Sequence, residues 1–382
     1  MLPVDLPGTV REALLAPLVD HHCHGVRRDD LSRAEFELLI GGEDGSPSPP
    51  GTTHFDTPFG AAVRRWCAPL LDLEPHAPPA VYLARRAELG AAEVNRRLLA
   101  GAGVVAFLVD AAAGDIELLS AAEMGRHGGA AADELVRIEE IERDVAELSE
   151  AAIDYLDSLG EELSARAARA VGLKTVVGSL FGLDFDPSRP ATGSVLAAAN
   201  RRLADPKEPL TDPVLLRHLL WSAIDVARER GLPVQFHTGL GGSALDPHRA
   251  DPARLGAFVR RLQPLGVPVI LLHCYPYHRQ AAFLASVHPH VYVDVGLALP
   301  HTAAGSARVM DELLELAPFH KQLFSSGCHG VAESAYLGAL YYRRALGTVL
   351  RGRLGAGEWS STDAVRIAHM IGSGNARRIY RL

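Results

Sequence analysis

The stretch "LVDHHCHGV", residues 18–26, joins a short apolar run to three histidines and a cysteine at four consecutive positions. His22 and His24 are two residues apart, so in an extended strand their side chains point to the same face. His21 and Cys23 alternate with them and are expected to pack behind the strand. The stretch therefore predicts a buried strand whose carboxyl end presents two imidazoles side by side.

Short apolar runs of the same kind recur along the chain. There are eight of them, at residues 16–22, 103–110, 134–140, 172–178, 232–238, 267–274, 290–296 and 321–327. Runs this short and uniformly apolar are typical of strands that are covered on both faces in a parallel sheet. Segments with helical periodicity lie between them, at residues 141–170, 212–231, 251–266 and 306–317.

Strands that alternate with helices over 382 residues predict an α/β fold, here a (β/α)8 TIM-type barrel. We expect residues 1–382 to form a single barrel domain. An open doubly wound sheet is the structural alternative. It has little support, because no glycine-rich phosphate-binding loop follows the first strand.

The connection between the first two predicted strands is unusually long. Residues 41–60 are rich in Gly, Pro, Ser and Thr, and helical patterns flank them. We expect residues 25–100 to form a helical insertion that caps one end of the barrel. The Ala- and Gly-rich segment 121–134 is expected to be a flexible loop.

The overall composition narrows the classes of function. The formal net charge is −8, without a dense basic run, which disfavours nucleic acids and anionic membrane surfaces as partners. The longest apolar stretches fall short of the roughly 20 residues that a membrane span needs, and the amino-terminal segment lacks the basic leader of a signal peptide. Four scattered cysteines are too few for a disulfide framework. We expect a cytoplasmic protein that acts on a small-molecule substrate.

Histidines stand at the ends of several predicted strands. His22 and His24 end the first strand, His237 the fifth and His273 the sixth, and the functional side chains of a barrel gather at these ends. Imidazoles from His22, His24 and His237 would hold Zn²⁺, with Mn²⁺ as the alternative, and leave a position open for water. His273 would stand beside that water as the catalytic acid or base. A purely structural histidine cluster is the alternative reading.

Several longer motifs resemble a known family. They are "DHHCHG" (20–25), "QFHTGLGG" (235–242), "LLHCYPYHRQAAFLA" (271–285), "FSSGCHGVAESAYLGALYYRRAL" (324–346) and "GNARRIYRL" (374–382). With them the chain resembles the amidohydrolase superfamily over nearly its whole length, in particular the amidohydrolase 2 branch. The last third is similar to the amidohydrolase-like domains that are fused to glutamine-synthetase-like domains.

The resemblance implies roles for individual residues. It assigns the metal to His22, His24 and His237, and gives His273 the polarisation of the substrate or the transfer of a proton. It also implies a metal-activated water that acts on a small substrate with a carboxylate or amide, and a homo-oligomer is common among relatives. A metal-assisted decarboxylase or lyase of the same superfamily is the alternative activity.

The segment after the eighth strand departs from the family pattern. Relatives read Phe-Ser-Ser-Asp there, and the aspartate takes the proton from the metal-bound water. This chain has Gly327 in its place, so that general base is missing. Cys328 and His329 follow directly and are candidates for a replacement ligand or base. A catalytically impaired pseudoenzyme that acts as a binding protein is therefore the third hypothesis.

A second departure concerns substrate binding. Relatives carry Tyr-Arg after the fourth strand, whereas Leu180 stands here at the arginine position and cannot clamp a carboxylate. His278 and Arg279, which follow the sixth strand, are candidates to contact an anionic substrate instead. Exposed charge at the start of a helix is the plain alternative for both.

Lys174, on the fourth predicted strand, has two interpretations. It could bind substrate or, once carboxylated, bridge two metal ions. It could instead be a structural lysine paired with Glu139 or Asp294, because buried lysines are rarely unpaired.

Overall fold

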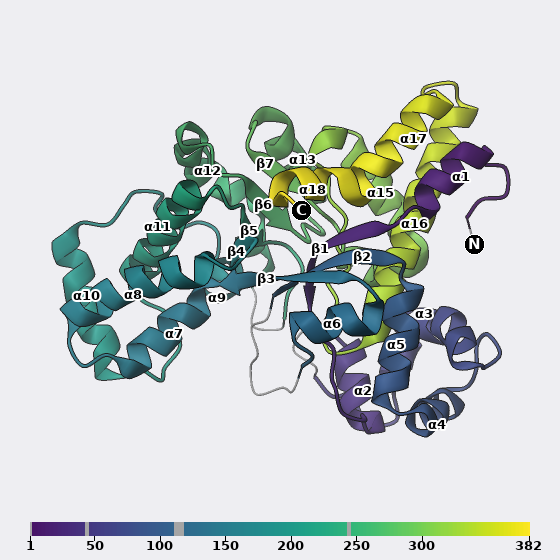
Figure 1. The fold of residues 1–382 in the computed structure, drawn as a ribbon, viewed down its shortest axis with the longest axis horizontal. Helices are drawn as coiled ribbons and strands as arrows, with labels where there is room; N and C mark the ends of the chain where they lie inside the picture. Colours follow the sequence, from purple (N-terminus) through teal and green to yellow (C-terminus); the bar gives the residue numbers. More distant parts are fainter. Residues whose placement is uncertain (1, 43–45, 111–117, 243–245) are drawn as a thin grey trace.

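The computed structural model describes residues 2–42, 46–110, 118–242 and 246–382. Seven parallel strands form one sheet in the order of the sequence, β1 to β7 (Figure 1). They are β1 (Leu18–His24), β2 (Val104–Asp110), β3 (Ala131–Arg137), β4 (Gly172–Thr175), β5 (Val234–His237), β6 (Val269–Leu272) and β7 (Val291–Val293). Sequential order and parallel pairing are typical of a TIM-type barrel, so the predicted fold class is confirmed at this level.

Residues 321–327, predicted as the eighth strand, form no regular strand. Their segment nevertheless lies between β7 and β1, since the Leu323 amide donates to the Val293 carbonyl and the His21 amide donates to the Phe324 carbonyl. Further along, the His24 amide donates to the Cys328 carbonyl. The segment thus follows the last strand of the sheet and contacts the first.

The connections between the strands are mostly helical. The helices outside the first connection are α1 (Gly8–Leu15), α6 (Ala121–Gly128), α7 (Ile138–Leu148), α8 (Ala152–Ala167), α9 (Val177–Leu180), α10 (Thr192–Ala204), α11 (Pro213–Arg230), α12 (Gly256–Leu262), α13 (His278–Val287), α14 (Ala298–Thr302), α15 (Ser306–Leu314), α16 (Ala332–Gly355), α17 (Ser361–His369) and α18 (Asn375–Tyr380). In Figure 1, α7, α8, α10 and α11 lie to the left of the strands, and α15 to α17 lie to the upper right.

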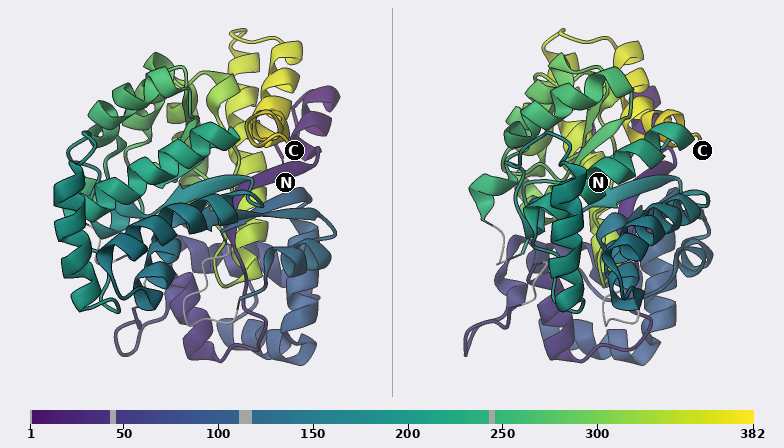
Figure 2. Two further views of the ribbon diagram at one scale, coloured as in Figure 1. Left: turned by 60° about the vertical axis from the view of Figure 1, so that its left-hand side comes forward. Right: turned by 90° about the vertical axis from the view of Figure 1, so that its left-hand side faces the viewer.

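The connection from β1 to β2 contains α2 (Arg33–Ile40), α3 (Pro58–Ala62), α4 (Pro79–Leu89) and α5 (Ala91–Gly101). Figure 2 shows these helices gathered at the bottom of both views. The Arg86 guanidinium of α4 pairs with the buried Glu333 carboxylate of α16 at 2.8 Å, and the Tyr82 hydroxyl donates to the same carboxylate. The connection thus contains helices that contact α16, and its assignment as an insertion that caps the barrel stays a prediction. Residues 43–45 of the predicted loop lie outside the described residues.

The segment 121–134 is not the flexible loop that its composition suggests. Ser120 and Glu123 form a capping box that starts α6, and β3 begins at Ala131, three residues earlier than predicted. Reciprocal capping of two backbone N–H groups stabilises a helix start even where small residues follow. The predicted helix over 141–170 is also wrong in detail, because α7 and α8 divide it at residues 149–151.

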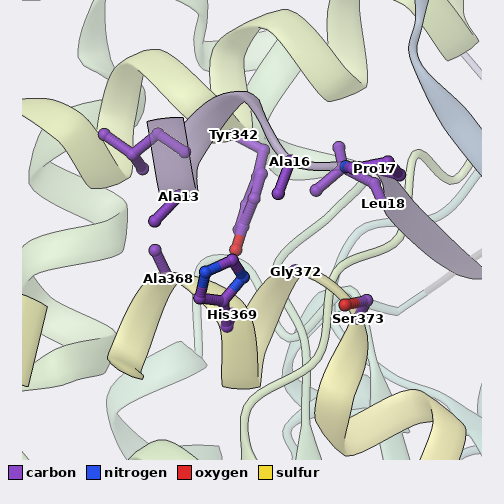
Figure 3. A pocket seen from close by; sticks show the side chains of 10 residues that line it. Ala13, Ala16, Pro17, Leu18, Tyr342, Ala368, His369, Gly372 and Ser373 are labelled. Carbon is purple, nitrogen blue, oxygen red and sulfur yellow. The ribbon is translucent and has the colours of Figure 1, made fainter. Parts of the chain in front are cut away.

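A small pocket lies at the amino-terminal end of β1, between α1, α16 and α17, and Figure 3 shows its lining with the Tyr342 ring at the centre. The pocket leaves no space for a water molecule, so it is a packing defect. None of the described helices is long and apolar enough to cross a membrane.

Candidate metal centre

The pairing of β1 with β2 builds the first part of the site. The register sets His24 opposite Asp110, so an imidazole and a carboxylate end neighbouring strands at the same level. His22, His24 and Asp110 each offer one ligand atom, and these atoms lie within 4.8 Å of one another. Two imidazole nitrogens and a carboxylate oxygen form a donor set that suits Zn²⁺ or a similar divalent ion. The residues present therefore fit a metal ion.

Two basic side chains share the Asp110 carboxylate. The Lys174 ammonium and the Arg137 guanidinium each lie 2.7 Å from its Oδ2 atom, and the same ammonium is 3.5 Å from His22 Nε2. Burial on its own would raise the pKa of Asp110, but the charges of Lys174, His24 and Arg137 hold it well below its usual range. Asp110 is therefore ionised at neutral pH, and Lys174 is the cation that lies among the donor atoms.

The histidines of the site are neutral at pH 7. Burial, together with the Lys174 charge, holds the pKa of His22 and of His24 well below the usual value. Burial and the neighbouring His273 do the same for His237, and burial lowers the pKa of His273 to about 4. Neutral imidazole is the form that ligates metal.

His273 directly follows β6, and its ring lies between those of His22 on β1 and His237 on β5. Its ring centroid is 5.3 Å from that of His22 and 4.9 Å from that of His237. The His273 backbone has φ 68°, a left-handed conformation that costs a residue other than glycine about 1–3 kcal/mol. Such strain is concentrated at functional sites. Its Nδ1 atom is buried and has no hydrogen-bond partner within the part of the chain that the structure describes.

His237 belongs to this group of rings, but its Nε2 atom is 2.6 Å from the Leu240 carbonyl oxygen. It is not one of the three residues whose ligand atoms lie within 4.8 Å. The structure thus brings His237 next to His273 and leaves its role as a metal ligand a prediction.

The sequence model of the amidohydrolase family matches residues 19–382. The chain belongs to this family. Protein fluG of Emericella nidulans is 30% identical over 225 residues, which cover 56% of this chain and 26% of fluG. The chain therefore corresponds to about a quarter of that relative's length.

Solved structures show the same fold for this member of the amidohydrolase family. A protein of Lactobacillus casei ATCC 334, provisionally described as a metal-dependent hydrolase, superposes with a TM-score of 0.84 at 22% identity and covers 96% of this chain and 95% of its own. Uronate isomerase of Thermotoga maritima has a TM-score of 0.66 at 12% identity, with 98% of each chain covered. At these identities the likeness concerns the fold alone.

Gly327 replaces the aspartate that the amidohydrolase pattern leads one to expect. Its φ is +59°, and a Cβ atom added there would lie 2.8 Å from the Leu297 Cβ. The backbone and the packing thus both favour glycine at this position. In this chain the carboxylate of the candidate metal site is that of Asp110 on β2.

The two residues after Gly327 point in different directions. The His329 ring centroid lies 5.3 Å from that of His24, so His329 reaches the histidine group. The Cys328 thiol is buried and faces the Val331 carbonyl at 3.5 Å, and burial raises its pKa to about 12. A protonated thiol is a poor ligand, so the replacement role of Cys328 stays a prediction that these contacts do not favour.

His278 and Arg279 are engaged by acidic residues of α15 and the turn after it. His278 lies 2.7 Å from the Glu312 carboxylate, and Arg279 lies 2.8 Å from that of Glu315. Arg279 is 60% exposed. Their assignment to substrate stays a prediction, and the structure places neither of them beside Asp110.

Asp110 is the residue of the site that sequence reasoning missed. It is the last residue of the apolar run "GVVAFLVD", and a charged residue at the end of a buried strand is the available signal. Lys174 is indeed paired, but with Asp110 and not with Glu139 or Asp294. Glu139 accepts hydrogen bonds from Thr175 and from the Val176 amide instead.

Proposed function

We propose that this amidohydrolase is a divalent-metal-dependent enzyme that acts on a small polar substrate with a carboxylate or an amide. The observation that carries the proposal is the group of His22, His24 and Asp110, whose ligand atoms lie within 4.8 Å of one another. His237 is the proposed further ligand, Zn²⁺ the proposed ion and Mn²⁺ the alternative. When bound, such an ion polarises a carbonyl or lowers the pKa of a water molecule.

His273 is the proposed acid–base residue. It is neutral at pH 7, since burial lowers its pKa to about 4, and its buried Nδ1 atom is unpartnered among the described residues. In the tautomer that leaves the lone pair on Nδ1, this nitrogen would accept a proton from a reacting group and return it later.

Lys174 and Arg137 are the proposed binding residues for an anionic substrate. Both cations lie 2.7 Å from the Asp110 carboxylate, and the Arg137 Nε atom is buried without a hydrogen-bond partner among the described residues. A guanidinium with an unused N–H donor is suited to bind a carboxylate. The two residues would thus take over the role that Leu180 cannot fill.

Gly327 favours a second candidate, a lyase or other non-hydrolytic reaction of the same site. With glycine at this position, the aspartate that accepts the proton of an attacking water is missing, whereas decarboxylation requires no attacking water. The name of the Thermotoga maritima relative, uronate isomerase, also describes a reaction without net addition of water.

A substrate panel in H₂¹⁸O tests the proposal. Zinc- or manganese-loaded protein is incubated with N-acyl amino acids, lactones and small carboxylic acids, and His273→Asn serves as the comparison. The hydrolase predicts ¹⁸O in the organic product, the lyase predicts release of CO₂ and an organic product without ¹⁸O, and both predict loss of turnover in His273→Asn. If metal-bound protein transforms none of these substrate classes, the result would contradict the proposed enzyme activity and favour the hypothesis of a binding protein.

A further inference from the structure

A chain of buried hydrogen bonds begins directly behind the metal centre. The His22 Nδ1 atom lies 2.9 Å from the Gln235 Oε1 atom. The Gln235 amide nitrogen lies 2.9 Å from the His21 carbonyl oxygen and 2.7 Å from the Tyr380 hydroxyl. His21, His22 and Gln235 are fully buried, and Tyr380 is 5% exposed. Gln235 pairs with Lys174 in the β4–β5 register, so it lies at the level of the site.

The His21 carbonyl determines the direction of this chain. A carbonyl oxygen only accepts, so the group of Gln235 that faces it must be the NH₂ group. The carbonyl oxygen of Gln235 then faces His22 Nδ1, which must carry the proton. The proton of neutral His22 is thereby placed on Nδ1, and its Nε2 atom keeps the lone pair.

Tyr380 continues the chain on the other side of Gln235. Its oxygen accepts from the Gln235 amide, so its O–H donates to His21 Nδ1 at 3.0 Å. The proton of His21 then lies on Nε2, which donates to the Asp294 carboxylate at 2.7 Å. In this chain of hydrogen bonds each donor faces an acceptor. A buried network that is satisfied in this way is rigid.

The carboxyl-terminal helix α18 brings Tyr380 into the barrel. Asn375, the first residue of α18, is buried and donates 2.8 Å hydrogen bonds to the carbonyls of Phe319 and Gln322. These bonds fix the helix to the segment that precedes Gly327. The motif "GNARRIYRL" thus contains both the anchor of the helix and the hydroxyl that reaches Gln235.

We infer that Gln235 and Tyr380 are positioning residues for the metal centre, which hold His22 as the Nδ1-protonated tautomer and direct its Nε2 lone pair toward Lys174 and Asp110. The hydrogen bonds among His22, Gln235 and Tyr380 do not require a metal ion. The inference rests on the proposed function only in that the Nε2 lone pair of His22 would bind the metal. A partner on the second nitrogen of a ligating histidine fixes its tautomer and orientation, and its loss weakens metal binding by about 10- to 100-fold.

The tautomer is measured first, on metal-free protein labelled with ¹⁵N-histidine. Long-range ¹H–¹⁵N spectra are recorded at pH 7.5, and His22 is identified by the signals that disappear in His22→Asn. We expect Nδ1 of His22 to carry the proton in the natural protein and a mixture of tautomers in Gln235→Leu. A proton on Nε2 in the natural protein, or an unchanged spectrum in Gln235→Leu, would overturn the inference.

Zinc affinity is measured second, by competition with a chromophoric chelator. Tyr380→Phe removes one buried hydroxyl and is expected to weaken zinc binding about 10-fold, and Gln235→Leu up to about 100-fold. Tyr342→Phe is the matched control, because the Tyr342 hydroxyl (Figure 3) is also buried but has no hydrogen-bond partner among the described residues. Equal affinities of Tyr380→Phe and Tyr342→Phe would overturn the role of Tyr380. The expected tautomer without any zinc binding would support the hydrogen-bond chain and contradict the proposed function.

Discussion

The Lys174 ammonium lies 2.7 Å from the Asp110 carboxylate and 3.5 Å from His22 Nε2. A buried cation thus lies among the atoms that would bind a metal ion. In the metal-free protein this cation, with Arg137, neutralises a carboxylate that would otherwise be costly to bury. A divalent ion would compete with Lys174 for the same oxygen.

Replacement of Lys174 tests this competition. Lys174→Met removes one cation from a buried pair, and we expect a loss of up to about 3–5 kcal/mol in the free energy of unfolding without metal. Zinc should restore more stability to this variant than to the natural protein, because the ion then neutralises Asp110. Thermal unfolding with and without zinc measures both effects.

Lys321→Met is the matched control for this experiment. Lys321 is buried, and its ammonium donates to the backbone carbonyls of Ala285 and His288. Its loss should destabilise the protein without any added benefit from zinc. An equal zinc effect in Lys174→Met and in the natural protein would speak against the competition.

Introducing the family's aspartate at Gly327 should destabilise the protein. Gly327 has φ +59°, and an added Cβ would lie 2.8 Å from the Leu297 Cβ. We expect Gly327→Asp to cost about 1–2 kcal/mol for the left-handed backbone and about 1–3 kcal/mol more for the contact. Gly129→Asp is the control, because Gly129 has φ +64° but open space around it. Urea unfolding that gives both variants the same stability would refute the account of Gly327.

His329 and Cys328 should respond differently to substitution. The His329 ring lies 5.3 Å from the His24 ring, so His329→Ala should weaken zinc binding or lower turnover. The Cys328 thiol faces the Val331 carbonyl, so Cys328→Ala should leave zinc affinity unchanged. A large effect of Cys328→Ala and none of His329→Ala would reverse these assignments.

Acid should destabilise the metal-free protein through its buried histidines. The His301 ring stacks on Phe59 at 5.1 Å, and burial lowers the pKa of His301 to about 4, compared with about 6.5 for an unperturbed histidine. The unfolded chain therefore binds a proton that the folded chain does not, and stability falls as the pH drops from 6.5 toward 4.

His301→Phe tests this contribution, because it keeps a ring against Phe59 and removes the titrating group. Its free energy of unfolding should fall less steeply with decreasing pH than that of the natural protein. The slope should not vanish, since burial also lowers the pKa of His273 to about 4. Urea unfolding at several pH values measures it, and parallel curves for the two proteins would exclude a contribution from His301.

The sequence was sufficient to predict the seven strands of the sheet and the proximity of His22 to His24, because both depend on local patterns. The two-residue spacing of His22 and His24 and the apolar runs before the strand ends depend only on neighbouring residues. The helix start at Ser120 was missed, although its capping box with Glu123 was visible, because Ala and Gly dominate the residues around it.

Asp110, Gln235 and Tyr380 could not be predicted as parts of the site in the same way. Asp110 lies beside His24 only through the register of β1 and β2. Tyr380 is 145 residues from Gln235, yet their polar atoms lie 2.7 Å apart. Long-range pairs of this kind depend on how the sheet closes and where the last helix docks.

The most direct test of the metal centre is the metal content of chelator-treated protein after dialysis against zinc or manganese, measured by elemental analysis. We expect about one equivalent per chain in the natural protein, and loss of that metal in both Asp110→Asn and the His22→Ala/His24→Ala double variant. A natural protein that takes up no metal, or an Asp110→Asn variant that binds metal as fully and as tightly, would contradict the site of His22, His24 and Asp110.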